Sequence, residues 1–257
     1  MNSQILKVMS YNIQVGISTR QPHHYLLHSW KHVLPHSQRL ANLDRVARLL
    51  SDFDMVGLQE VDAGSMRSNY INLAEYLALK AGFPFWYHQV NRNIGRIAKH
   101  SNGLLSRFQP TEINDIPLPG LIPGRNAIMA RYGFGEDSLV LFMLHLALSR
   151  RARMRQLAMI SERVNEFKHV ILMGDMNCRP GSPEMNLLFQ RTHLREPLEE
   201  TLTFPSWRPQ HYIDHILVTP DLEVQSVQAL HHAYSDHLPI VMELVLPKSI
   251  QMTRVAA

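Results

Sequence analysis

The sequence predicts an α/β protein built as a four-layer α/β/β/α sandwich, in which two mixed β-sheets pack face to face between outer helices. The chain has 257 residues, of which 45% are hydrophobic, and this is enough to bury a sizeable core. Each half of the chain mixes apolar runs typical of buried strands with one or two amphipathic helical segments. No stretch between the halves has the composition of a linker, so we expect the two sheets to pack together. The same pattern is compatible with other α/β folds.

The first part of the chain alternates strands with helices. We expect a strand at Ile5–Tyr11, followed by a loop at 18–36 that is rich in histidine and aromatic residues. Apolar residues at helical spacing predict an amphipathic helix at about 37–51. A short buried strand at Met55–Leu58 follows, and then a second helix at Tyr70–Lys80 that ends before a glycine.

The remainder of the chain is rich in short apolar runs, separated at first by proline and glycine clusters. These runs predict strands at Phe85–His88, Gly103–Ser106, Ala127–Tyr132, Leu139–Leu146, His169–Met173, 212–218, 222–230 and 239–246. Ser149 is the expected N-cap of a helix that runs to about Phe167, and a shorter helix is expected at Pro183–Gln190. We expect residues 248–257 to form a loose C-terminal tail.

Composition excludes several classes of protein. A single cysteine, Cys178, rules out an internal disulfide framework, and no histidine partner that would make it a nucleophile is evident. The net charge of +4 and the pI of about 9.3 favour an anionic substrate, without the dense basic tail of many nucleic-acid-binding proteins. No signal peptide and no apolar run of ~18 residues is present. We therefore expect a cytoplasmic protein with no transmembrane segment and no evident obligate protein partner.

Polar residues gather at the ends of the predicted strands, from one end of the chain to the other. Carboxylates, amides and imidazoles at such positions suit a hard divalent cation and the activation of water beside a phosphate. The clusters are Ser10-Tyr11-Asn12, Gln59-Glu60, Gly174-Asp175-Met176-Asn177, Asp214-His215 and Ser235-Asp236-His237. Each cluster alone could be an ordinary turn or a solvated strand end, but together they predict one site assembled by folding.

The chemistry of each residue type suggests a role. In an extended segment Asp175 and Asn177 point the same way, so the carboxylate can align a water while the amide donates to a phosphoryl oxygen. Glu60 suits Mg²⁺ or Mn²⁺, with Asn12 as a ligand or a supporting group. An aspartate can orient an imidazole, which pairs Asp236 with His237 and makes His145 a candidate partner of Asp214.

The ordered set resembles the endonuclease/exonuclease/phosphatase superfamily over nearly the whole chain, from Tyr11-Asn12 to Ser235-Asp236-His237. The resemblance implies two mixed sheets in a single catalytic domain at 1–247 and a divalent metal, usually Mg²⁺, for which Mn²⁺ can substitute. It makes Glu60 the main metal ligand, with Asn12 and Asp236 near the ion. It also implies catalytic roles. Asp175 and Asn177 would handle the attacking water and the phosphate, and His237 would be the general base or a phosphate stabiliser. Asp214 would pair with a catalytic histidine, and His145 would contact the phosphate or assist the leaving group.

The substrate class follows less directly from the sequence. Arg125 could reach a phosphate, and Arg155 could brace the site from its helix, although a solvated surface arginine is the ordinary alternative for both. We expect a phosphodiesterase or nuclease, with nucleic acid as the default phosphate-ester substrate. A phospholipid head group or a small phosphate ester is the chief alternative. A non-catalytic binding module on the same fold is the alternative from another class.

Overall fold

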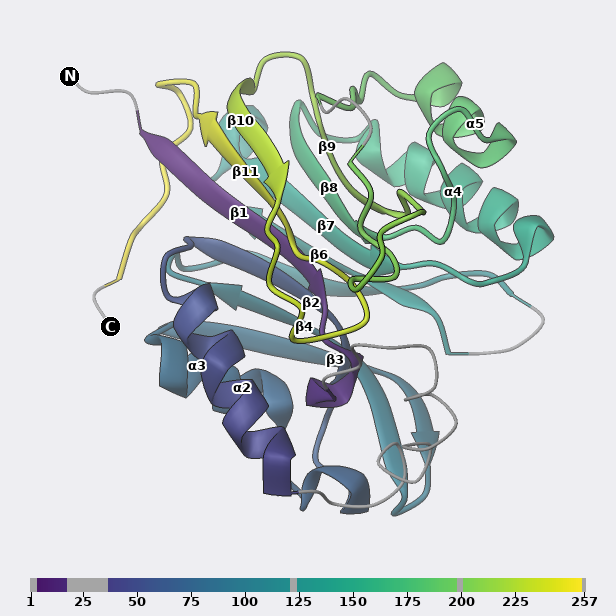
Figure 1. The fold of residues 1–257 in the computed structure, drawn as a ribbon. Coiled ribbons are helices and arrows are strands. Elements are labelled where there is room, and N and C mark those ends of the chain that lie inside the picture. Colours follow the sequence, from purple (N-terminus) through teal and green to yellow (C-terminus); the bar gives the residue numbers. More distant parts are fainter. Residues whose placement is uncertain (1–3, 18–36, 121–123, 198–200, 256–257) are drawn as a thin grey trace.

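The computed structural model describes residues 4–17, 37–120, 124–197 and 201–255. Two β-sheets lie face to face, with a pair of helices on the outer side of each (Figure 1). This arrangement confirms the predicted four-layer sandwich. The loop at 18–36, with its histidine and aromatic residues, lies outside the described residues. No helix within the described ranges is both long and apolar enough to cross a membrane.

The first sheet has six strands in the order β10-β11-β1-β2-β4-β3 and is covered by two helices (Figure 1). The strands are β1 (Ile5–Asn12), β2 (Met55–Asp62), β3 (Phe85–Ile94), β4 (Ala98–Ser106), β10 (Glu223–Ala229) and β11 (Ile240–Val245). The covering helices are α2 (Ser37–Leu50) and α3 (Leu73–Ala81), and the short 3₁₀ turns η1 (Gln14–Gly16) and η3 (Met66–Ser68) follow β1 and β2.

The second sheet has five strands in the order β5-β6-β7-β8-β9, and its outer face carries two further helices. The strands are β5 (Glu112–Pro117), β6 (Asn126–Tyr132), β7 (Leu139–His145), β8 (His169–Asp175) and β9 (Asp214–Val218). The helices are α4 (Arg150–Val164) and α5 (Pro183–Arg191), and the 3₁₀ turn η4 (Gly135–Asp137) precedes β7.

The continuous apolar runs of the central strands arise because these strands are buried on both faces. In β7, Leu141 and Met143 point into the core between the sheets, while Val140 and Phe142 pack against α4 and α5. β1 alternates in the same way between the inter-sheet core and the layer under α2 and α3. Gly57 of β2 allows the sheets to approach, because a Cβ there would lie 2.7 Å from the Met143 and Met173 side chains.

The structure departs from the predicted elements in several places. Strand β5 was absent from the prediction because half of its sequence, EINDIP, is polar and most of it is exposed. β3 and β4 form a longer hairpin than the apolar runs indicate, since their polar ends remain paired beyond the core. The helix expected from Tyr70 begins instead at Leu73, where the Asn72 side chain accepts hydrogen bonds from the backbone N–H groups of Ala74 and Glu75.

The segment after Leu246 is packed, whereas the sequence predicts a loose tail. Ile250 is buried in the core between the sheets. The Gln109 N–H donates to Thr253 O at 2.9 Å, and the Val255 N–H donates to Arg107 O at 3.0 Å. The Arg254 guanidinium pairs with Asp54 at 2.8 Å. The segment 247–255 therefore packs along one edge of the sandwich. Its sequence is short and has no hydrophobic periodicity that would predict this packing.

Candidate active site

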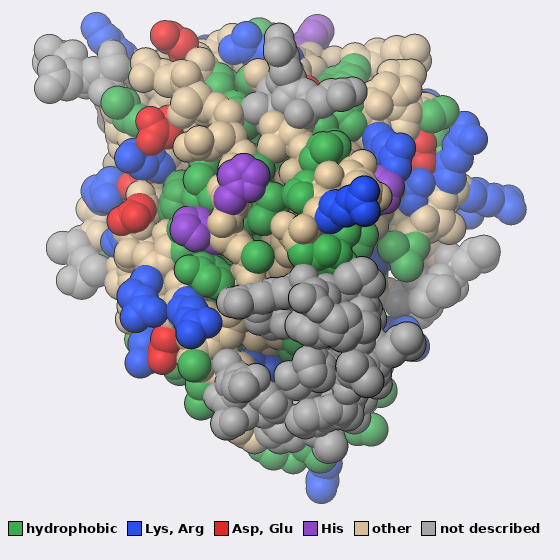
Figure 2. Space-filling model, in the orientation of Figure 1, with side chains coloured by type: hydrophobic (Ala, Val, Ile, Leu, Met, Phe, Trp, Pro, Cys, Tyr) green, Lys and Arg blue, Asp and Glu red, His purple; other side chains and the backbone are tan. Residues whose placement is uncertain are grey.

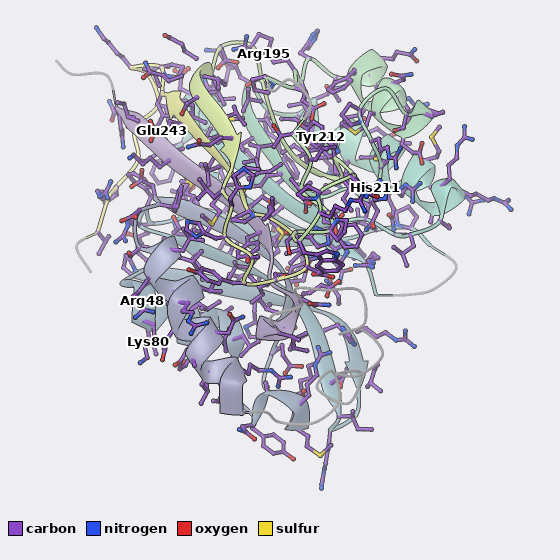
Figure 3. All side chains as sticks on the ribbon, in the orientation of Figure 1. Arg48, Lys80, Arg195, His211, Tyr212 and Glu243 are labelled. Atoms are coloured by element: carbon purple, nitrogen blue, oxygen red, sulfur yellow. The ribbon has the colours of Figure 1, made fainter. Side chains whose placement is uncertain are left out.

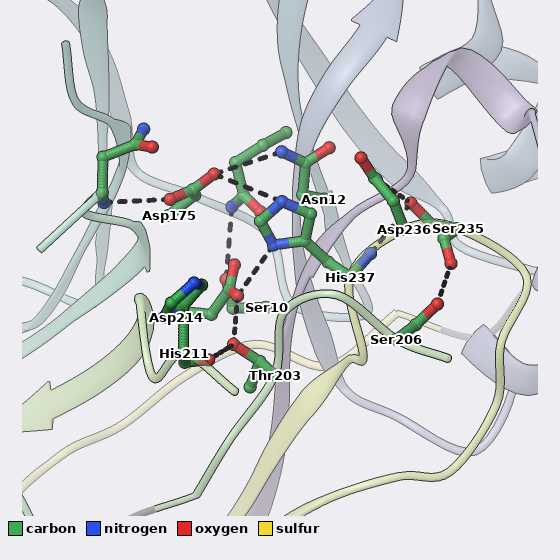
Figure 4. A network of polar contacts seen from close by, with 12 residues as sticks. Ser10, Asn12, Asp175, Thr203, Ser206, His211, Asp214, Ser235, Asp236 and His237 are labelled. Atoms are coloured by element: carbon green, nitrogen blue, oxygen red, sulfur yellow. Dashed lines mark hydrogen bonds and ion pairs between the residues drawn. The ribbon is translucent and has the colours of Figure 1, made fainter. Parts of the chain in front are cut away.

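The ends of five strands bring the predicted polar residues together at one edge of the sandwich. Asn12 lies opposite Gln59 in the parallel pair β1–β2, and His145 lies opposite Asp175 in the parallel pair β7–β8. Asp214, at the start of β9, is the register partner of Asp175 on its other side. The segment just before β11 brings Ser235-Asp236-His237 to the same place (Figure 4). Residues far apart in the sequence thus form one buried cluster.

His237 is held by Asp214. The His237 Nδ1 lies 2.8 Å from Asp214 Oδ2, which also accepts a hydrogen bond from Thr203 Oγ1 at 2.6 Å. Burial disfavours the charged imidazole, but the adjacent Asp214 carboxylate outweighs it, so the pKa of His237 is raised well above its ordinary value. The ring of Phe204 packs against the His237 ring, with 4.8 Å between centroids. The pair fixes the ring so that Nε2 points toward Asp175, at 3.8 Å from its Oδ2.

Asp175 occupies the centre of the cluster. Its Oδ2 accepts from Asn12 Nδ2 at 3.2 Å and lies 3.5 Å from His145 Nε2, while its Oδ1 accepts from the Asn177 N–H at 3.0 Å. Burial, followed by the nearby Asp214 charge, raises the pKa of Asp175 to about 7. A carboxyl group with this pKa is able to take up a proton near neutral pH.

His145 is the second imidazole that faces Asp175. Burial lowers the pKa of His145 well below its ordinary value, and the positive charges of Arg125 and His237 lower it further. The two histidines therefore differ, with His145 favoured in its neutral form and His237 in its charged form. The expected pairing of His145 with Asp214 is wrong, because the partner of Asp214 is His237.

Glu60 is placed by an irregularity in its strand. The register of β2 against β4 shifts between Leu58 and Val61, so Gln59 and Glu60 form a bulge. Glu60 adopts a left-handed backbone conformation with φ 55°, which is uncommon for a residue other than glycine. The side chain is half-buried. Burial and the neighbouring Asp236 carboxylate raise the pKa of Glu60, although His237, Asn12 and Arg125 oppose this effect.

The backbone before Asp175 requires a glycine. Gly174 has φ 145°, and a Cβ at this position would lie 1.9 Å from the Leu144 carbonyl oxygen on β7. Asn177, beyond the strand, is left-handed with φ 51°, and its Nδ2 donates to Leu146 O at 3.0 Å. The Gly174-to-Asn177 segment is therefore fixed against the end of β7, with the Asp175 carboxylate turned into the cluster.

Of the two arginines predicted to serve the site, Arg125 lies near the cluster and Arg155 does not. Arg125 is half-buried and near enough for its charge to act on Glu60, His145 and Asp175. Arg155 is not brought to the cluster: its side chain is exposed on α4, and none of the described contacts of the cluster involves it.

Arg153, two residues before Arg155 on α4, makes the contacts near the cluster that were expected of Arg155. The Arg153 guanidinium contacts Glu184 at 2.7 Å and donates to the carbonyl oxygens of Ala147 and Leu148, just beyond His145. The first six residues of α4 include four arginines, at positions 150, 151, 153 and 155. Their composition does not show which one faces the cluster, and only their position around the helix identifies Arg153.

The structure adds contacts around the site that the sequence does not predict. Thr203 binds Asp214, and Ser206 Oγ donates to Ser235 O at 2.6 Å. His215, next to Asp214, lies with Nε2 2.9 Å from the Cys178 carbonyl oxygen and Nδ1 2.5 Å from Glu196. No spacing in the sequence marks these contacts. Burial raises the pKa of Cys178 to about 12, which agrees with the expectation that this thiol is not a nucleophile.

One group of side chains in the cluster could bind a metal ion. Asp175, Asp214 and His237 are buried, and one ligand atom of each lies within 4.8 Å of the others. Asp214 Oδ1 is buried without a hydrogen-bond partner among the described residues. Four carboxylates, those of Glu60, Asp175, Asp214 and Asp236, share this region with few positive charges. The excess of negative charge suits a cation.

Comparison with known proteins assigns this fold and site to a family. The model of the endonuclease/exonuclease/phosphatase family matches residues 9–237, so the chain belongs to that family. The match confirms the resemblance that the sequence motifs indicate. Members of the family hydrolyse phosphate esters with the help of a divalent metal. No curated protein sequence matches the chain.

Several solved structures share the fold. An endonuclease/exonuclease/phosphatase family protein from Bacteroides thetaiotaomicron has a TM-score of 0.73 at 17% identity, covering 96% of this chain and 100% of that one. A mannosyl-6-phosphatase from the same species has a TM-score of 0.71 at 17% identity, covering 93% and 99%. ANGEL2, a 2′,3′-cyclic phosphatase, has a TM-score of 0.69 at 16% identity, covering 96% of each chain. At sequence identities of 16–17%, these similarities show a shared fold and nothing further.

Proposed function

We propose that the chain is a divalent-metal-dependent phosphodiesterase that hydrolyses its substrate by in-line attack of water on phosphorus. The observation that carries this proposal is the buried arrangement around Asp175, whose carboxylate lies 3.5 Å from His145 and 3.8 Å from His237. A general base, imidazole donors and a nearby pair of carboxylates are the parts that hydrolysis of a phosphate ester requires.

Glu60, Asn12 and Asp236 would hold the metal, which we propose is Mg²⁺, with Mn²⁺ as a substitute. The Asp236 charge contributes to the raised pKa of Glu60, so a cation between these carboxylates would relieve their repulsion. Oxygen donors of this kind are the ligands that Mg²⁺ prefers. When bound, the metal supplies polarisation of a phosphoryl oxygen and neutralisation of its charge.

The grouping of Asp175, Asp214 and His237 is better explained as acid–base machinery than as the metal site. Asp214 Oδ2 and His237 Nδ1 are already paired at 2.8 Å, which leaves only Oδ1 of Asp214 without a partner among the described residues. The raised pKa of His237 also favours the protonated imidazole, which has no lone pair left to bind a metal.

The remaining residues take roles that follow from their protonation and position. Asp175 would align the attacking water and accept its proton, since its pKa of about 7 suits a base that works near neutrality. His237, held by Asp214, would neutralise charge that develops on the phosphoryl oxygens. Asn177, His145 and Arg125 would bind the phosphate or assist departure of the leaving group. No covalent nucleophile is needed.

Nucleic acid is our first choice of substrate, and a small phosphate ester is the second. The fold similarity to a mannosyl-6-phosphatase is the observation that favours a phosphomonoester. A phospholipid head group has less support. A lipid substrate would require an exposed apolar loop, and in the apolar segment Leu118–Ile122 the side chain of Leu118 is buried.

The proposal is tested by hydrolysis of bis-p-nitrophenyl phosphate and p-nitrophenyl phosphate with Mg²⁺, with Mn²⁺ and with EDTA. We expect metal-dependent turnover that prefers the diester and is lost in Glu60→Ala. Glu75→Ala, which removes an exposed carboxylate from α3, is the matched control and should retain full activity. Preference for the monoester would favour the phosphatase alternative.

The non-catalytic alternative is tested with the Asp175→Ala variant. A binding module would show no metal-dependent turnover in the wild type, so Asp175→Ala would change nothing. Loss of turnover in a folded Asp175→Ala protein would exclude the binding module. The fold of the variant is checked by circular dichroism and thermal unfolding.

A further inference from the structure

A basic hollow adjoins the catalytic cluster on the side of α4 and α5. It has a volume of about 420 Å³, and its lining includes Arg150, Arg153, Asn177, Arg179, Glu184 and His211. Figure 2 shows Lys and Arg side chains gathered on the side of the molecule where Figure 1 places α4, and Figure 3 places His211 on the same side. Apart from Asn177, the residues named here have no role in the proposed hydrolysis.

The hollow begins where the catalytic cluster ends. Asn177 lines it, and the Asn177 backbone N–H donates to Asp175 Oδ1, while Asp175 Oδ2 faces Asn12 on the opposite side. Asp175 therefore lies between the proposed metal ligands and the hollow. A second connection runs through aromatic rings, because His211 stacks on Phe204 and Phe204 packs against His237. A substrate whose phosphate sits at Asp175 would extend one substituent over the hollow.

The charges around the hollow favour an anion. Three arginines face one glutamate there, and Arg153 is the one that this glutamate, Glu184, binds closely, at 2.7 Å. Arg150 reaches Glu184 only at 3.9 Å, and its side chain is 67% exposed. Arg179 is also exposed, and its guanidinium contacts the ring of His211. Arg150 and Arg179 thus lie exposed at the rim, with Glu184 and His211 as their respective partners.

The backbone adds to this positive potential. Both α4 and α5 begin at the hollow, where Ser149 and Ser182 cap their first turns. The N-terminal ends of two helices carry partial positive charge and favour anions within about one turn. A guanidinium group binds phosphate through paired, charge-assisted hydrogen bonds, so phosphate is the anion that Arg150 and Arg179 fit best.

We propose that this hollow binds a second phosphate group of the substrate, held by Arg150 and Arg179. This inference rests on the proposed function for the position of the scissile phosphate. The preferred substrates would then carry two phosphates, either as neighbouring phosphates of a polynucleotide or as the two phosphates of a small bisphosphorylated compound. The two arginines would act as specificity-determining residues.

Direct binding tests the proposal without requiring turnover. Calorimetric titrations use the 257-residue protein carrying Asp175→Asn, with Mg²⁺, and compare two pairs of probes. One pair is dithymidylate with and without a 5′-phosphate, and the other is fructose 1,6-bisphosphate and fructose 6-phosphate. We expect the two-phosphate member of at least one pair to bind about tenfold more tightly, and the pair that shows this identifies the source of the phosphate.

Substitutions at the rim complete the test. In the Asp175→Asn background, Arg150→Gln with Arg179→Gln should reduce the tenfold preference to about twofold or less. Arg151→Gln, an exposed neighbour on α4 that does not line the hollow, is the matched control and should keep the preference. Equal binding of both members of each pair, or a preference that survives the double substitution, would overturn the proposal. A preference that the double substitution removes, in a protein without phosphoesterase turnover, would uphold the phosphate site and reject the proposed function.

Discussion

The imidazole of His237 and the carboxylate of Asp214 form a buried pair, with 2.8 Å between Nδ1 and Oδ2. The pair joins the segment before β11 to the start of β9, and Thr203 adds a hydrogen bond to the same carboxylate oxygen. It fixes both the protonation and the direction of the ring, which leaves Nε2 toward Asp175. If this pair acts as a unit in catalysis, removing either side chain should lower the rate of hydrolysis by nearly the same factor.

We therefore predict that Asp214→Asn and His237→Gln each lower kcat by about 10²-fold or more, and that the double variant is hardly worse than either single variant. The physical reason is that an imidazole without its carboxylate loses both its orientation and its charge. Steady-state kinetics with bis-p-nitrophenyl phosphate in saturating Mg²⁺ provide the measurement. Multiplicative losses in the double variant would show that the two residues act independently.

The same pair should make stability depend on pH. The pKa of His237 is raised in the folded protein above its ordinary value of 6.5, so the pair's contribution is fully present below pH 6.5 and is lost as pH rises through the folded-state value. The difference in unfolding free energy between wild type and Asp214→Asn should thus be larger near pH 6 than near about pH 9. Urea unfolding in EDTA measures it.

An exposed pair supplies the control for this pH dependence. Asp44 lies 3.5 Å from Lys80 on the surface, and no imidazole takes part in that contact. The change in unfolding free energy caused by Asp44→Asn should therefore stay constant between about pH 6 and about pH 9. If the difference in unfolding free energy between wild type and Asp214→Asn instead grew with pH, the proposed charge state of His237 would be wrong.

Gly174 should tolerate no side chain. A Cβ at this position would lie 1.9 Å from a backbone oxygen of β7, which no side-chain rotation relieves. We expect Gly174→Ala to lower the free energy of unfolding by more than about 3 kcal/mol, measured by urea denaturation. Gly181→Ala is the control, because Gly181 also has positive φ but has no neighbouring atom within 4 Å of the added Cβ. Gly181→Ala should lower the free energy of unfolding by only about 1–2 kcal/mol. An equal decrease for Gly174→Ala and Gly181→Ala would reject the steric explanation.

Metal binding should stabilise the folded protein through Glu60. At a Mn²⁺ concentration of about 100 times Kd, binding to the folded state alone adds about 2.7 kcal/mol, which raises Tm by roughly 5–10 °C for a chain of this size. In Glu60→Gln we expect this rise to disappear, while the metal-free variant is no less stable than wild type because a repulsion has been removed. Thermal unfolding with and without EDTA measures both effects. An unchanged Mn²⁺ response in Glu60→Gln would place the metal elsewhere.

The sequence predicted the layers and most of the cluster because these follow from local patterns. Continuous apolar runs mark strands buried on both faces, and polar residues at the ends of parallel strands such as β7 and β8 must meet. Contacts between distant segments carry no such pattern. Thr203 reaches Asp214 from an irregular segment, and Arg153 is distinguished from Arg155 only by helical register. β5 is paired with β6 although most of its residues are exposed. The packed segment at 247–255 is short and lacks periodicity, so its burial also escapes local reasoning.

The stereochemistry of hydrolysis tests the central claim most directly. A single diastereomer of thymidine 5′-(p-nitrophenyl phosphorothioate), hydrolysed with Mg²⁺ in water enriched in oxygen-18, reports whether water attacks phosphorus in one displacement. We predict inversion of configuration at phosphorus in the wild type and a loss of rate of about 10²-fold or more in Asp175→Asn. Retention of configuration, or undiminished hydrolysis by Asp175→Asn, would contradict in-line attack of a water activated by Asp175.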